Sequence, residues 1–195
     1  MTELAHIPLF PLKTVLFPGG LLPLRIFEHR YLDMVSRCTR EGQGFGVVLI
    51  LEGAEAATPV LTHRVGTLAR IVDFYQLSDG LLGITALGEK RFRLRESRRQ
   101  PDGLNVGTVE WLTDGQAVPL PAAFELHARL LEQALSQLGG LYAQLERHFD
   151  DAMWVGARLL EILPLKLEDK QHCLELDDPL ERLEFLKPLV RTQGR

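Results

Sequence analysis

The chain has 195 residues, of which 46% are hydrophobic and 25% charged, and its formal net charge is −4. This composition is that of a globular protein, and it excludes a fully disordered chain and a fibrous repeat. The longest aliphatic run, residues 47–51, is too short to span a membrane, and the N-terminus lacks the pattern of a signal peptide. The only two cysteines lie far apart in the sequence, which excludes a disulfide scaffold. We therefore expect a cytoplasmic protein without membrane attachment.

Proline, glycine and aspartate punctuate the first 116 residues, and strand-forming segments lie between them. Strands are predicted at residues 7–12, 21–26, 45–51, 66–76, 81–87, 91–95 and 105–112. Asp79-Gly80 predicts a hairpin turn between two of them. A helix is predicted over residues 28–40, because apolar residues recur there on one helical face: Tyr31, Met34, Val35 and Cys38.

The pattern becomes helical after residue 121. Apolar stripes at residues 124–138 and 155–163 each predict a helix, and residues 166–176 predict a short one. The last helix is expected to begin at Pro179 with Asp178 as its N-cap. We therefore expect an α+β protein with a β-rich unit at residues 1–116 and a helical unit at residues 117–195.

Motifs that would indicate an enzyme are absent from the sequence. It contains no P-loop and no nucleophile elbow. Gly42, Gly44 and Gly46 follow the predicted helix and precede a strand, which is the reverse of a dinucleotide-binding loop. The histidines and cysteines lack metal-ligand spacing, and the acidic pairs at 150–151 and 177–178 suit helix caps. We predict no enzymatic activity, no cofactor and no metal; a hydrolase without a recognisable motif is the remaining enzymatic reading.

Basic residues are concentrated at positions 90–99. On a strand, Arg91, Arg93 and Arg95 would share one face and form a cationic stripe. The stripe either contacts phosphates or an acidic partner, which makes an RNA-binding domain the alternative function, or it is a solvated strand face with acidic neighbours. An aromatic content of 7% provides a poor platform for base stacking, which disfavours nucleic acid as the partner.

Short blocks of characteristic residues run through nearly the whole chain. Near the N-terminus they are Pro8-Leu9-Phe10-Pro11-Leu12, Val15-Leu16-Phe17-Pro18-Gly19 and Leu22-Pro23-Leu24-x-Ile26-Phe27-Glu28-x-Arg30-Tyr31. Later blocks are Phe45-Gly46-Val47-Val48, Val65-Gly66-Thr67-Leu68-Ala69-Arg70-Ile71, Gly88-x-x-Arg91-Phe92-Arg93-Leu94 and Leu174-Glu175-Leu176-Asp177-Asp178-Pro179. In this order they resemble the N-terminal substrate-recognition domain of the ATP-dependent protease Lon.

The resemblance implies a PUA-like β-barrel with one packed helix, followed by a helical bundle. It also implies a recognition role, because in Lon this domain helps to engage unfolded or tagged polypeptides. A similar domain in cereblon, a ubiquitin-ligase adaptor, suggests docking of a folded partner protein instead. The ATPase and Ser–Lys protease modules of Lon have no counterpart in these 195 residues, so we expect a stand-alone, non-catalytic module that binds polypeptide or protein. The oligomeric state is left open.

Peptide binding is expected in the first of these blocks. Prolines stiffen its extended backbone, and apolar surface would come from Phe10, Phe17, Leu21, Leu22 and Phe27. A stiff apolar edge can accept an extended peptide by strand addition or as a hydrophobic groove. The alternative is that these residues are mostly core and turn.

Overall fold

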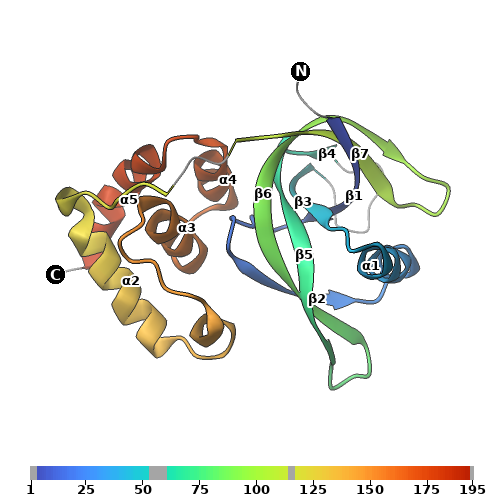
Figure 1. The fold of residues 1–195 in the computed structure, drawn as a ribbon, viewed down its shortest axis with the longest axis horizontal. Coiled ribbons are helices and arrows are strands. Elements are labelled where there is room, and N and C mark those ends of the chain that lie inside the picture. Colours follow the sequence, from blue (N-terminus) through green and yellow to red (C-terminus); the bar gives the residue numbers. More distant parts are fainter. Residues whose placement is uncertain (1–3, 53–60, 114–116, 194–195) are drawn as a thin grey trace. The chain divides into compact units, whose positions relative to one another are not determined.

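The structure is a computed structural model that describes residues 4–52, 61–113 and 117–193 (Figure 1). The chain divides into two compact units, residues 1–113 and residues 114–195. The expected boundary at residue 116 lies outside the described residues. Among the described residues, no helix is long and apolar enough to cross a membrane.

The described part of the first unit contains seven strands and one helix. They are β1 (Leu4–Leu12), β2 (Leu21–Ile26), α1 (His29–Glu41), β3 (Phe45–Glu52), β4 (Leu61–Thr62), β5 (Val65–Gln76), β6 (Leu82–Arg99) and β7 (Asn105–Trp111). The predicted strand at residues 21–26 is confirmed, and so is the hairpin turn, where the Gly80 N–H donates to the Leu77 carbonyl at 2.9 Å. The two-residue strand β4 is too short for a periodic pattern and was not predicted.

Five of these strands close into a ring. Their order is β1-β7-β6-β5-β3, and β3 returns to β1 in a parallel pair while the other neighbours are antiparallel. The strands β2 and β4 attach to this ring through β6 and β3. The ring with its single helix α1 confirms the predicted α+β fold with a barrel and one packed helix (Figure 1).

The long strand β6 organises the ring. The segments predicted as separate strands at 81–87 and 91–95 form one continuous strand of 18 residues. Gly88 lies in its middle, where an added Cβ would approach the Phe17 carbonyl oxygen to 2.3 Å. One edge of β6 pairs with β5, and the other edge pairs first with β2 and then with β7. This arrangement places β2 beside β6 outside the closed ring.

The helix α1 buries the face that its sequence predicts. Its four buried residues join the core cluster of the barrel: Tyr31, Met34, Val35 and Cys38. Gly42 ends the helix in the left-handed conformation, with φ at 64°, and its N–H donates to the Thr39 carbonyl. Glycine has no steric penalty in that conformation, which explains why the helix stops there.

The described part of the second unit is helical. Its elements are η1 (Ala122–Phe124), α2 (Glu125–Gln137), η2 (Gly140–Gln144), α3 (Ala152–Ile162), α4 (Leu167–Glu175) and α5 (Pro179–Gln193). Asp151 and Asp178 cap α3 and α5, since each carboxylate accepts a hydrogen bond from the N–H two residues later, at 2.9 and 2.8 Å. The predicted role of the two acidic pairs as helix caps is thus confirmed, and in each pair the second aspartate is the cap.

Candidate functional site

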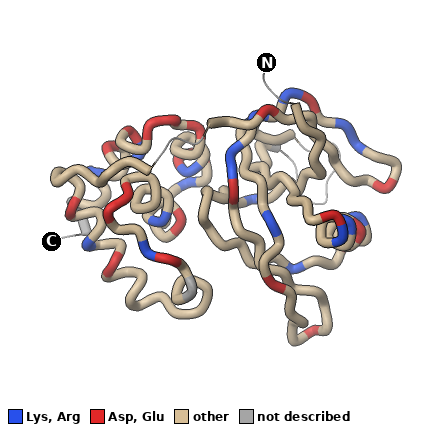
Figure 2. The backbone as a smooth tube through the Cα atoms, viewed as in Figure 1, with Lys and Arg blue, Asp and Glu red and all other residues tan. Residues whose placement is uncertain are grey.

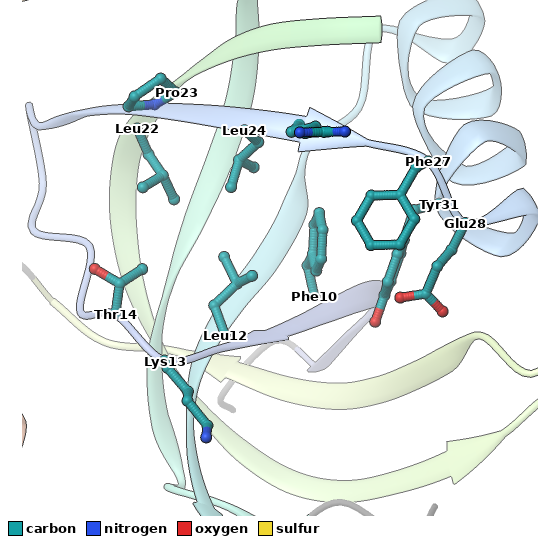
Figure 3. Close-up of a pocket in the computed structure, with 11 residues that line it drawn as sticks. Phe10, Leu12, Lys13, Thr14, Leu22, Pro23, Leu24, Phe27, Glu28 and Tyr31 are labelled. Atoms are coloured by element: carbon teal, nitrogen blue, oxygen red, sulfur yellow. The ribbon is translucent and has the colours of Figure 1, made fainter. Parts of the chain in front are cut away.

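A groove of about 660 Å³ opens in the first unit between β1 and β2 (Figure 3). Its walls come from three segments: the end of β1 with the two residues after it, β2, and the entry into α1. The residues that line it are Phe10, Leu12, Lys13, Thr14, Leu22, Pro23, Leu24, Arg25, Phe27, Glu28 and Tyr31. Figure 3 shows the side chains of Leu22 and Leu24 directed from β2 toward those of Phe10 and Leu12 on β1.

The floor of the groove is part of the barrel core. The rings of Phe10 and Tyr31 stack at a centroid distance of 3.9 Å and an interplanar angle of 21°. Phe10 also meets Phe45 of β3 at 5.9 Å. Both residues of the stacked pair are buried, at 5% and 4% exposure. An aromatic pair held in this way gives the groove a rigid, apolar base.

One large apolar side chain stands at the mouth of the groove. Phe27 follows β2 directly, precedes the helix cap Glu28, and is 61% exposed. Leu22 and Leu24 are partly buried against the core. A phenyl ring left in water beside an apolar groove is typical of a surface that a partner covers.

Two of the charged groups that line the groove, Arg25 and Glu28, each contact a nearby group of opposite charge. Arg25 forms an ion pair with Asp79 of the β5–β6 turn at 2.5 Å. Glu28 pairs with Arg30 at 2.7 Å, and Arg30 also donates to the Gly103 carbonyl at 3.1 Å. Because these charges are matched locally, the groove offers apolar contact more than a field of one sign.

Hydrogen bonds fix the connection between β1 and β2. The Thr67 hydroxyl donates to the Leu16 carbonyl at 2.6 Å, and both residues are buried. The Gly19 N–H donates to the Gly88 carbonyl at 2.8 Å, while Phe17 is fully buried beneath the connection. These contacts tie the connection to β5 and β6.

The structure brings three of the five predicted peptide-binding residues to the groove. Phe10, Leu22 and Phe27 line it, whereas Phe17 and Leu21 do not. The prediction of apolar surface at Phe17 is wrong, because its side chain is 0% exposed and serves to anchor the connection. Leu21 is half-buried and precedes Leu22 on β2. Because side chains alternate along a strand, the Leu21 side chain lies on the face of β2 opposite to that of Leu22.

Sequence reasoning missed other groove residues. Leu12 and Leu24 follow Phe10 and Leu22 by two positions, so period-two alternation was a sufficient signal for both. Tyr31 was predicted only as part of the buried helix stripe. No local pattern indicates that β1 and β2 face one another, because that follows from the pairing of both strands with distant segments.

The predicted arginine stripe does not form as expected. Arg91 is 1% exposed, and its neighbour Phe92 is also fully buried, so both faces of β6 are covered at this point. A β-bulge between Leu94 and Glu96 breaks the alternation, and Arg95 at the bulge pairs with Glu110. Figure 2 shows basic and acidic positions interspersed along β6. The alternative RNA-binding face therefore loses Arg91 to the interior, whereas Arg93 and Arg95 are exposed and Arg95 pairs with Glu110.

The remaining chemistry of the described residues lies away from the groove. They contain no group of three or more metal-ligating side chains. Burial raises the pKa of the Cys38 and Cys173 thiols and of Tyr142, and it lowers the pKa of Lys170. Burial also raises the pKa of Glu161 to about 7. None of these five side chains lines the groove.

Comparisons with known proteins agree on one family. Residues 6–191 match the family model described as the ATP-dependent protease La (LON) substrate-binding domain. The chain is 26% identical to the Lon protease of Vibrio parahaemolyticus over 98% of its own length and 25% of that protein. It is equally similar to Lon protease 2 of Myxococcus xanthus, over 96% of this chain and 24% of that protein. The chain thus spans about a quarter of the length of these relatives.

Solved structures show the same similarity. The crystal structure of a Lon N-terminal domain protein from Xanthomonas campestris superposes with a TM-score of 0.79 at 40% identity, covering 94% of this chain and 98% of that one. The N-terminal domain of a Mycobacterium avium complex Lon protease gives a TM-score of 0.68 at 17% identity, over 96% and 98% of the two chains, and shows the shared fold. With a family model matched over nearly its whole length, this chain belongs to the family of LON substrate-binding domains.

Proposed function

We propose that this chain binds unfolded or extended polypeptide in the groove between β1 and β2, and that it does so without catalysing a reaction. The observation that carries the proposal is the exposure of Phe27, at 61%, beside an apolar groove of about 660 Å³. The family name supports it, since it describes a domain that binds substrates of a protease.

The groove suits side chains that a folded protein keeps inside. Burying one Leu-sized or Phe-sized side chain contributes about 1.5–3 kcal/mol. Two or three such side chains contribute about 3–9 kcal/mol before the costs of association and of ordering an extended chain are subtracted, so a dissociation constant in the micromolar range, about 8 kcal/mol, is the tightest affinity expected. Affinity of this order allows many different segments to bind and to leave.

The proposal is tested by titrating the purified protein against a fluorescently labelled, permanently unfolded polypeptide, such as reduced and carboxymethylated α-lactalbumin. The expected result is saturable binding at micromolar concentration that survives a rise from 0.15 to 0.5 M salt, because apolar contacts are not screened. The native, disulfide-intact form of the same protein serves as control and is expected to bind at least tenfold more weakly.

Two other outcomes contradict the proposal. Binding that disappears in 0.5 M salt indicates charge pairing in place of an apolar site. Equal binding of the folded control indicates a folded partner, the second class of partner that the family resemblance suggests.

A further inference from the structure

Two stretches of strand edge beside the groove have no strand partner in the described part of the chain. In the described part of the chain, β2 pairs with β6 along one edge, and no strand pairs with its other edge. On β1, the partner β7 extends only as far as Leu9, whereas β3 on the opposite edge continues to Leu12. Phe10 to Leu12 therefore lack a strand neighbour on the β7 side.

The pairing of β6 identifies which edge of β2 is open. The strands β2 and β7 lie on the same edge of β6, because β5 occupies the other edge opposite all of β2 and opposite Phe92 and Arg93, where the pairing with β7 begins. The outer edge of β7 carries β1. Residues from β1 and β2 line the groove (Figure 3), and the four consecutive β2 residues Leu22 to Arg25 are among them, so the groove runs along β2.

Alternation along the ladder identifies the main-chain groups on the open edge of β2. The Gly88 N–H donates to the Gly20 carbonyl at 2.8 Å, so Gly88 and every second residue before it on β6 face β2. The residues of β2 that pair with them direct their main-chain N–H and C=O groups toward β6. The β2 residues in between direct these groups to the open edge. The residues of this second set are Leu21, Pro23 and Arg25. Pro23 thus falls on the open edge, where a strand tolerates proline because no ladder bond is lost.

We infer that the polypeptide bound in this groove adds as a β-strand to the open edge of β2, with every second side chain directed onto the apolar floor. The inference rests on the proposed function and specifies its ligand as an extended segment with apolar residues at alternate positions. A strand residue occupies about 160 Å³, from a rise of ~3.3 Å, a strand spacing of ~4.8 Å and a sheet spacing of ~10 Å. The groove of about 660 Å³ thus holds about four residues.

A second copy of this chain does not suit the open edge. Two β2 strands paired antiparallel about a two-fold axis, with Leu21 opposite Arg25, place Pro23 opposite the Pro23 of the other copy. Neither proline has an N–H, so the central pair of hydrogen bonds cannot form. A segment of another chain, with an N–H at each position, makes bonds that self-pairing cannot.

N-methylated peptides test the inference. The probe is a fluorescein-labelled peptide of ten residues in which leucine and serine alternate. All leucines in an added strand direct their amides to one edge and all serines to the other. Methylating two central amides of the set that faces β2 is expected to weaken binding at least tenfold, and methylating two of the other set less than threefold.

The outcomes separate this inference from the proposed function. A parent peptide that binds but responds equally to both methylation patterns overturns strand addition and leaves an apolar groove in place. Failure of both the parent peptide and unfolded α-lactalbumin to bind overturns the proposed function and the inference with it.

The protein side of the edge provides a second test. Pro23→Ala adds a donor to the open edge, so we expect the parent peptide to bind about threefold to tenfold more tightly. Pro101→Ala, in the exposed β6–β7 turn, is the matched control and is expected to leave the affinity unchanged. If Pro23→Ala binds the parent peptide no more tightly than Pro101→Ala does, the peptide does not add to the open edge of β2.

Discussion

Phe27 and Phe10 line the same groove, yet 61% of the Phe27 side chain is exposed and only 5% of Phe10. Phe10 stacks on Tyr31 and belongs to the barrel core, whereas Phe27 stands at the mouth of the groove. Substitutions at these two positions are therefore expected to separate polypeptide binding from folding.

Phe27→Ala is expected to weaken binding of unfolded polypeptide about tenfold or more, because the phenyl ring would lose its contact with the bound segment. The free energy of unfolding should change by less than about 0.5 kcal/mol, since the ring is already in water. Phe74→Ala, at a 47% exposed phenylalanine outside the groove lining, is the matched control. An equal loss of binding in both variants, measured by fluorescence anisotropy, would place the binding site elsewhere.

Phe10→Ala is expected to lower the free energy of unfolding by about 3–5 kcal/mol, because it leaves a cavity beneath the groove and removes the stack with Tyr31. Urea denaturation followed by circular dichroism measures this change. A loss below about 1 kcal/mol would contradict the placement of Phe10 in the core.

Thr67→Val keeps the shape of the side chain but removes the hydroxyl that donates to the buried Leu16 carbonyl. The expected cost is about 1–3 kcal/mol, because that carbonyl loses its hydrogen bond in the interior. Thr39→Val, which removes a similar bond to the Val35 carbonyl from an exposed helical position, should cost less than about 0.5 kcal/mol. Equal costs in urea denaturation would show that the buried bond contributes nothing specific.

The stability of the second unit should depend on pH through Glu161. Burial raises the pKa of its carboxyl from 4.5 to about 7, although Arg158 donates to it at 2.7 Å and opposes the shift. Lys170 donates to the Glu161 main-chain carbonyl at 3.1 Å, and Tyr142 is the other titratable group whose pKa this carboxylate influences. The folded state thus holds a proton that the unfolded state releases between pH 4.5 and 7.

Stability is therefore expected to fall as the pH rises through that window, by on the order of 3 kcal/mol. Glu161→Gln cannot titrate and should remove most of this slope. Thermal unfolding of both proteins at pH 5, 6, 7 and 8 measures it. A wild-type stability that rises over the same interval, or an unchanged slope in Glu161→Gln, contradicts the assignment.

The local elements of this fold were predictable from the sequence, because each depends on near neighbours. The stripe that contains Tyr31 and Met34 specifies the buried face of α1, and Asp178 before Pro179 specifies the start of α5. The candidate site was predictable only in part. Phe10, Leu22 and Phe27 are in the groove, but whether a phenylalanine in this segment lines a surface or anchors a loop depends on distant contacts.

Phe17 and Arg91 illustrate those contacts. Phe17 is buried because the connection that carries it is bonded to Gly88, 71 positions later in the chain. Arg91 is buried because β6 is covered on both faces at that point, which alternation within a single strand cannot reveal. The bulge at Arg95 likewise arises from the register between β6 and β7.

The measurement that tests the central claim most directly is an amide chemical-shift titration of the isotopically labelled protein with the alternating leucine–serine peptide. We predict that the largest shifts fall on Phe10–Thr14 and Leu21–Glu28, the two segments that face the groove, with Leu21 and Arg25 among the most affected amides. Shifts concentrated in residues 117–193, or spread evenly over the surface of the first unit, would contradict the proposal that this groove is the polypeptide-binding site.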